Sequence, residues 1–154
     1  VPSNPNEFEL AKLLATELTA MGLTNIEISE FGCLTAKLAS NLPDGIKAPS
    51  IGWCAHIDTV DCGLSPDIHP HLVKNYNGGD ICLNAEKEIW LRKSEHPELN
   101  PYVGDDILVT DGTSVLGADN KSGVAVIMEA LSVVTGENRS HGDIYVAFVP
   151  DEEI

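Results

Sequence analysis

The sequence lacks any apolar run that approaches the ~20 residues needed to cross a bilayer. It also opens, over residues 1–5, without the basic and apolar regions of a secretory leader. These absences argue against a membrane-spanning helix and against export. We therefore expect a cytoplasmic protein with no membrane partner.

Basic residues are scarce as well. The chain has 9 lysines and arginines against 24 acidic residues, and its formal net charge is -15. Such a surface repels the phosphate backbone, so we expect no nucleic-acid partner. Cations bound by some of these carboxylates would offset part of the charge.

Cysteines are few, and their spacing does not suggest a metal site. The four residues, Cys33, Cys54, Cys62 and Cys82, form no C-x-x-C pair. A zinc site built from thiolates is therefore poorly supported, and free thiols fit a reducing cytosol. Cys54 lies inside an apolar run, where we expect a small core residue.

What the sequence does contain is three apolar runs that are each followed by acidic groups. The runs cover residues 50–55, 114–116 and 145–150, and they predict buried strands. In open α/β sheets, ligands bind beyond the carboxyl ends of the strands. One histidine and several carboxylates at that edge are the donors of a zinc or hard-cation site. The clusters are His56 with Asp58, then Asp119, then Asp151-Glu152-Glu153.

Hydrophobic periodicity predicts the other elements. Residues 7–18 have helical spacing with acids in the first turn, and Gly22 is predicted to close this helix. A strand, a helix and a strand between residues 107 and 149 predict a βαβ unit. This indicates the α/β class, with a central mixed, largely parallel sheet flanked by helices. The predicted strands cover 25–30 and 34–38 (a hairpin or neighbouring strands), 49–55, 107–109 and 143–149. The second helix begins at Asp119 or Ser122 and runs through Leu131, and residues 61–103 are predicted to be irregular.

His56 and Asp58 are candidate functional residues because a spacing of two puts both side chains on one face of a strand. The alternative is a chance His-x-Asp pair that binds no metal. Asp119 has two interpretations as well: a helix N-cap, or a carboxylate that small neighbours leave open to close approach. A phosphate loop is disfavoured there because Gly-Lys-Ser is required and Lys121-Ser122-Gly123 is present.

Glu152 and Glu153 follow the last strand, and adjacent residues of an extended chain point in opposite directions. One carboxylate can therefore bind a metal while its neighbour accepts a proton from water. Metal-assisted hydrolysis needs this division of roles. The alternative is a solvated acidic turn.

Together these segments resemble the M20 family of dinuclear zinc peptidases. The resemblance runs from about the first residue to the end of the chain, and it rests on the motifs in combination. They are His56-Ile57-Asp58-Thr59, Gly117-Ala118-Asp119-Asn120-Lys121-Ser122-Gly123 and Asp151-Glu152-Glu153-Ile154.

The resemblance implies two zinc ions and a role for each candidate residue. Two-metal sites hold their ions about 3.5–4 Å apart, so that one carboxylate can bridge them. Asn120 stands where an acid is common in the family, and the resemblance implies a cis peptide bond between it and the bridging residue. The implied roles are His56, Asp119 and Glu153 as metal ligands with Asp119 as the bridge, Asp58 as the catalytic-site acid that supports His56, and Glu152 as the general base.

The implied function is a metal-dependent aminopeptidase that releases the N-terminal residue of short peptides, tripeptides in particular. Two alternatives stay open. One is another M20-type amidohydrolase, such as a dipeptidase or an N-acyl amino acid deacylase, and the other is a non-catalytic metal-binding fragment. Asp80, in a Gly-Gly-Asp segment, is a further candidate for the substrate's α-ammonium group, with a plain turn acid as its alternative.

The family also implies parts that these residues do not encode. We expect residues 1–154 to be the amino-terminal part of a catalytic domain, without the lid or dimerisation domain and without the remaining catalytic segment and its metal ligands. On that expectation the chain alone is inactive and binds zinc weakly. A homodimer is an expectation for the full-length protein.

Overall fold

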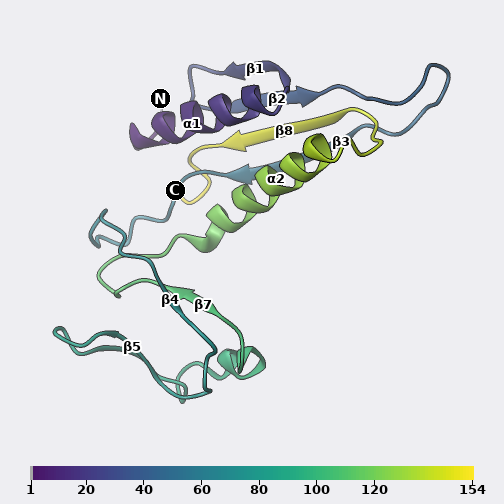
Figure 1. Ribbon diagram of the computed structural model, residues 1–154. Coiled ribbons are helices and arrows are strands. Elements are labelled where there is room, and N and C mark those ends of the chain that lie inside the picture. Colours follow the sequence, from purple (N-terminus) through teal and green to yellow (C-terminus); the bar gives the residue numbers. More distant parts are fainter. Residues whose placement is uncertain (1) are drawn as a thin grey trace. The chain divides into compact units, whose positions relative to one another are not determined.

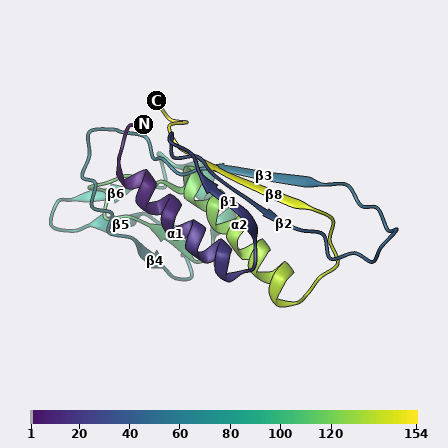
Figure 2. The same cartoon turned by 90° about the horizontal axis from the view of Figure 1, so that it is seen from above.

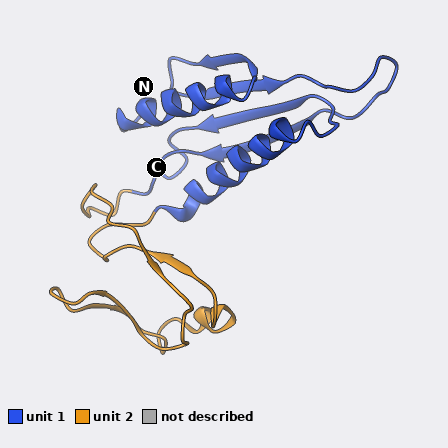
Figure 3. Cartoon of the chain, viewed as in Figure 1, with its two compact units in different colours: residues 1–60, 117–154 blue, residues 61–116 orange. Residues whose placement is uncertain are grey.

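The computed structural model describes residues 2–154 and divides them into two compact units, each with its own hydrophobic core (Figure 3). Unit 1 combines residues 2–60 with 117–154, and unit 2 is the segment 61–116. Unit 1 holds α1 (Asn6–Ala20), β1 (Thr24–Ile28), β2 (Leu34–Leu38), β3 (Ile51–His56), α2 (Ala118–Gly136) and β8 (Ile144–Val149); unit 2 holds β4 (His71–Val73), β5 (Ile81–Asn84), β6 (Ile89–Leu91), the 3-10 helix η1 (Pro97–Tyr102) and β7 (Ile107–Val109).

Helix α1 forms as its periodicity predicts. Acids lie in its first turn, where the helix dipole favours negative charge. The helix ends at Ala20, with Met21 as its C-cap, and Gly22 follows with a φ of 86°, a left-handed conformation that glycine adopts at no steric cost. Its buried residues form one stripe along the helix: Glu7, Ala11, Leu14 and Leu18.

Unit 1 is built on a four-stranded mixed sheet in the order β1-β2-β8-β3. Strands β1 and β2 form the predicted antiparallel hairpin, β2 pairs antiparallel with β8, and β8 pairs in parallel with β3. The α/β class and the mixed sheet are confirmed. The expectation of a largely parallel sheet is wrong for these strands. The short turn between β1 and β2 permits only antiparallel pairing, and β8 then joins the free edge of β2 in the antiparallel direction.

The predicted βαβ unit uses a different first strand. β7 belongs to unit 2, where it pairs with β4, whereas the parallel partner of β8 is β3. Unit 2 is inserted between the first strand and the helix of this crossover, so the strand nearest to α2 in sequence is not its partner. Residues 114–116 form no strand, and Asp119 therefore follows a loop.

Both helices of unit 1 lie on the same face of its sheet (Figures 1 and 2). Cys54 is exposed, so its expected place in the core is wrong. It alternates with the buried Ala55 along β3 and therefore points to the face that α1 and α2 do not cover. Beneath the helices, alternate residues of β2 and β8 are buried: Leu34, Ala36, Leu38, Ile144, Val146 and Phe148.

Phe148 is fully buried in this core, with 0% of its surface exposed. We expect Phe148→Ala to lower the free energy of unfolding by about 3–5 kcal/mol, because the substitution removes a large apolar side chain and leaves a cavity. Urea unfolding followed by circular dichroism measures this change. Val126→Ala is the control: Val126 is 68% exposed on α2, and stability should change by less than about 0.5 kcal/mol. Equal effects of the two substitutions would contradict the assigned core.

Unit 2 consists of short elements. Its two antiparallel sheets, β4-β7 and β5-β6, have strands of only three or four residues. Strands this short leave little alternation in the sequence, which is why residues 61–103 were predicted to be irregular, while β7 was predicted correctly. The core of this unit is Tyr76, Ile81 and Leu99, and the Tyr76 hydroxyl donates to the carbonyl of Gly79 at 2.6 Å.

Candidate metal centre

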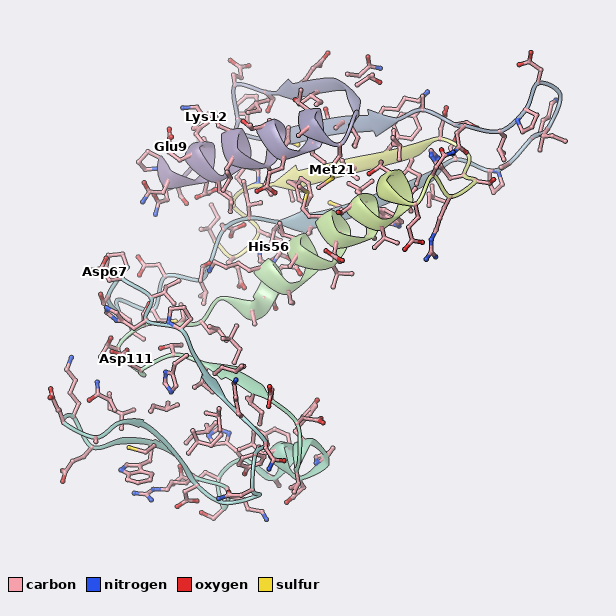
Figure 4. The ribbon with its side chains drawn as sticks, viewed as in Figure 1. Glu9, Lys12, Met21, His56, Asp67 and Asp111 are labelled. Atoms are coloured by element: carbon pink, nitrogen blue, oxygen red, sulfur yellow. The ribbon has the colours of Figure 1, made fainter. Side chains whose placement is uncertain are left out.

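The candidate site in unit 1 is organised around His56, the last residue of β3. His56 is registered with Val149 of β8 in the parallel pair, so the loops that follow the two strands begin side by side. The ring is buried, and it lies beside α2 in Figure 4. Its Nε2 atom is 3.0 Å from Oδ1 of Asp119, and its Nδ1 atom is 3.2 Å from Oδ1 of Asp58. The two predicted carboxylates therefore flank the two ring nitrogens.

Asp119 lies within the first turn of α2 and does not act as its N-cap. Its φ of -89° and ψ of 103° are not helical. The capping type of bond is made by Asn120, whose Oδ1 atom accepts from the backbone N of Gly123 at 3.1 Å. The peptide bond between Asp119 and Asn120 is cis, as the family resemblance implied. The N-cap interpretation is wrong, because Asn120 takes that role and the Asp119 carboxylate faces His56.

Asp58 connects the loop after β3 to the loop after β8. Its carboxylate is buried, and Oδ2 accepts a hydrogen bond from the backbone N of Glu153 at 2.8 Å. Burial would raise the pKa of this carboxyl, but the backbone N–H groups of Glu153 and Glu152 and the charge of His56 hold the pKa below its ordinary value. Asp58 is thus a buried acid that stays ionised.

Two atoms between His56 and Asp58 have no hydrogen-bond partner within residues 2–154: the Nδ1 atom of the ring and Oδ1 of the carboxylate. The two atoms lie 3.2 Å apart, which is close enough for an ion pair, but the angles at the two atoms do not meet the geometry of a hydrogen bond. A carboxylate bonded to the second ring nitrogen is the usual means of orienting a histidine that binds metal.

His56, Asp119 and Glu153 form a group whose ligand atoms all lie within 4.8 Å of one another. The donors are one imidazole nitrogen and two carboxylate oxygens, a set that zinc accepts. These are the residues that sequence analysis assigned as ligands, and they come from β3, α2 and the loop after β8. Oε2 of Glu152 lies 3.9 Å from Nε2 of His56, and its side chain is 61% exposed. Glu152 therefore borders the donor group while remaining accessible.

The charges around His56 change its proton affinity. Burial alone would lower the pKa of the ring, but the hydrogen bond with Asp119 and the charges of Asp58 and Glu152 outweigh it and raise the pKa above its ordinary value. In the metal-free chain, a protonated His56 is therefore favoured by three neighbouring carboxylates.

The stability of the metal-free chain should consequently depend on pH in two windows. Because the folded-state pKa of His56 is raised, its contribution to the free energy of unfolding is fully present below its unfolded pKa of about 6.5. This contribution is lost as the pH rises through the folded-state pKa. Asp58 has a lowered pKa, so its contribution is present above about pH 4 and lost as the pH falls. Urea unfolding in chelator between about pH 3 and 9 measures both. His56→Asn should remove the upper decline, and a wild-type profile without that decline would contradict the assigned contacts.

Glu7 is a buried carboxylate that sequence analysis treated only as a first-turn acid. Burial raises the pKa of Glu7, the hydrogen bond from the backbone N of Asn4 opposes this, and the charges of Asp151 and Asp58 add to the rise. Its Oε2 atom has no hydrogen-bond partner within the described part of the chain. A signal was present in the sequence, because Glu7 has the helical spacing of the buried stripe of α1.

Asp80 belongs to unit 2, and its carboxylate is already paired. Oδ2 accepts from Nη1 of Arg92, and Oδ1 accepts from the backbone N of Lys93, both at 2.9 Å. These bonds hold the pKa of Asp80 below its ordinary value. Asp80 also lines a cavity of about 250 Å³. The contacts favour the interpretation as a turn acid that joins the ends of β5 and β6.

The chain is similar over its whole length to curated bacterial proteins. It is 52% identical over 154 residues to a peptidase T-like protein of Yersinia pestis, covering 100% of this chain and 36% of that protein. It is 46% identical over 154 residues to peptidase T of Alkaliphilus oremlandii, covering 99% of this chain and 38% of that protein. The chain is a homologue of peptidase T. The predicted resemblance to M20 peptidases is thereby confirmed, although no family model matches the sequence.

Two solved structures are similar in fold to this chain. Aminopeptidase PepT of Bacillus cereus has a TM-score of 0.64 and 26% identity, covering 99% of this chain and 34% of that one. A tripeptidase of Staphylococcus aureus has a TM-score of 0.63 and 22% identity, covering 94% of this chain and 31% of that one. The chain spans about a third of the length of the peptidase T proteins it matches. No helix within residues 2–154 is long and apolar enough to cross a membrane.

Proposed function

We propose that these residues form part of the catalytic centre of a metal-dependent aminopeptidase that acts on short peptides, tripeptides in particular. The observation that carries the proposal is the grouping of His56, Asp119 and Glu153 within 4.8 Å in a homologue of peptidase T. The Bacillus cereus relative is an aminopeptidase, which supports release of the N-terminal residue.

The cofactor that we propose is zinc, with two ions in a complete centre. Nε2 of His56 and the carboxylates of Asp119 and Glu153 would hold one ion, since their donor atoms match its preferences. The Asp119 side chain is 85% exposed, which leaves it accessible to a second ion. When bound, zinc supplies Lewis acidity and lowers the pKa of water.

The carboxylates of Glu152 and Asp58 would have separate roles in the reaction. Glu152 would accept a proton from the attacking water and return it to the leaving amine, and its exposed position beside His56 suits both transfers. Asp58 would hold the His56 ring from the Nδ1 side and Glu153 through its backbone N. The loop after β3 and the loop after β8 would then be held together, and they would keep the metal ligands in fixed positions.

The proposal extends to the setting of the reaction. We propose a cytoplasmic protein whose partner is its short peptide substrate, and a homodimer for the full-length protein. Neither the sequence nor the described residues favour nucleic acid, since the net charge of -15 opposes it.

A substrate panel tests this function in a protein of the relatives' length that contains the whole chain. Tripeptides should lose their N-terminal residue, a chelator should abolish the reaction, and added zinc should restore it. Preferred cleavage of dipeptides or N-acyl amino acids would favour the alternative amidohydrolases. Zinc binding without hydrolysis of any substrate would favour the non-catalytic alternative. The 154-residue chain alone is expected to be inactive, and robust turnover by it would contradict that expectation.

A further inference from the structure

A second link joins the two segments that carry His56 and Asp119. Nζ of Lys121 donates a hydrogen bond to Oγ1 of Thr59 at 2.9 Å, across 62 positions of sequence. Thr59 lies in the loop that begins after His56, and Lys121 lies in the first turn of α2, next to Asn120. The bond therefore spans the same two segments as the contact between His56 and Asp119.

The backbone at Gly117 makes room for this bond. A Cβ at that position would overlap Nζ of Lys121 and come within 2.9 Å of Oγ1 of Thr59. Gly117 also has a φ of 68°, a conformation that favours glycine. The backbone N of Lys121 donates to the carbonyl of Gly117 at 3.2 Å and closes the turn. The missing side chain thus lets the ammonium group lie against the loop of Thr59.

Lys121 is withdrawn from water further than surface lysines are. It is half-buried in the folded chain. By contrast, Lys12 pairs with Glu9 on α1 while 61% of its side chain stays exposed. Partial removal of an ammonium group from water is unfavourable unless acceptors compensate for it. The hydrogen bond to Thr59 therefore restrains the side chain of Lys121. An exposed ion pair such as that of Lys12 restrains its side chain less.

We propose that Lys121 and Thr59 are positioning residues that set the separation between Asp119 and His56, and with it the affinity of this centre for a divalent cation. The identity of the ligand rests on the proposed function. Neither side chain belongs to the donor group, so the pair acts by holding the first turn of α2 against the loop after β3. Without the bond, the two donors would no longer be held in place before the cation arrives.

Four substitutions test the pair in the 154-residue chain. Lys121→Met keeps the length of the stem and removes the ammonium group, and Thr59→Val keeps the shape and removes the hydroxyl. Thr59→Ser retains the hydroxyl and serves as the conservative rescue. Lys12→Met is the matched control, because it removes an exposed lysine of the same charge.

Cobalt(II) is the probe, because its absorption spectrum reports coordination geometry as well as affinity. We expect Lys121→Met and Thr59→Val to weaken cobalt binding about 10- to 100-fold, as the loss of residues that orient ligands does elsewhere, and to alter the spectrum. Thr59→Ser and Lys12→Met should remain close to wild type. The double variant with Lys121→Met and Thr59→Val should have the same cobalt affinity as whichever single variant binds cobalt less tightly. The reason is that both substitutions remove one shared hydrogen bond.

Wild-type affinity and spectrum in both single variants would overturn the proposal, and so would fully additive losses in the double variant. Hydrogen exchange of the metal-free chain separates this proposal from the proposed function. Lys121→Met should speed exchange in residues 56–60 and 117–123, and unchanged exchange would refute the positioning role. If the wild-type chain binds neither cobalt nor zinc, His56, Asp119 and Glu153 hold no cation without further ligands, while the exchange result still decides the role of the pair.

Discussion

Glu152→Gln should lower kcat for tripeptide cleavage about 100- to 10,000-fold, the range that a positioned general base contributes, in an active protein that contains this whole chain. The amide has nearly the shape of the carboxylate, but it cannot accept the proton from water. Glu152 lies outside the group His56, Asp119 and Glu153, so zinc affinity should change little. Steady-state kinetics together with zinc titration measures the two quantities separately.

Glu17→Gln is the matched control, since it makes the same chemical change at an exposed position of α1. It should leave kcat and zinc affinity unaltered. Near-normal turnover by Glu152→Gln with bound zinc would show that the base has been assigned wrongly. A parallel loss of zinc affinity and turnover would instead make Glu152 a ligand.

Asp119→Asn should weaken zinc binding about 100-fold or more, because even residues that only orient ligands contribute 10- to 100-fold. The substitution keeps the shape of the side chain, and it leaves Asn120 to cap α2. It removes the negative charge that faces Nε2 of His56 at 3.0 Å. Isothermal titration with zinc, in a protein of the relatives' length that contains the whole chain, measures the loss.

Asp44→Asn is the control for this experiment, because it removes the same charge from an exposed position and so tests the effect of net charge alone. Its zinc affinity should equal that of wild type. If Asp119→Asn binds zinc as tightly as Asp44→Asn does, Asp119 is not a ligand and the donor group is wrong.

Much of unit 1 could be predicted from the sequence because its elements are long and periodic. Helix α1 and the hairpin of β1 and β2 were predicted within a few residues, since each buries one regular face. The direction of β8 and the partner of β3 could not be predicted, because strand order depends on contacts distant in sequence. Strands β4, β5 and β6 of unit 2 were not predicted, because strands of three or four residues carry almost no alternation.

Some residues of the candidate site could also be predicted from the sequence, and others could not. His56, Asp119 and Glu153 were predicted because their motifs are unusual in combination, and the structure brings their donor atoms together. The burial of Glu7 and the bond between Lys121 and Thr59 were not predicted. Glutamate and lysine are usually solvated, and the helical spacing that Glu7 shares with the buried stripe of α1 is a weaker signal than this tendency. Only the folded chain shows that Lys121 is half-buried.

The distribution of the three donors along the chain has a further consequence. His56 and Asp119 are 63 positions apart, and Glu153 lies in another segment again. A cation held by all three would act as a reversible cross-link that exists only in the folded chain. Binding of this kind adds about 2.7 kcal/mol to folding when the free ion is at 100 times its Kd. The supply of free metal would then govern how long the polypeptide survives proteolysis, independently of any turnover.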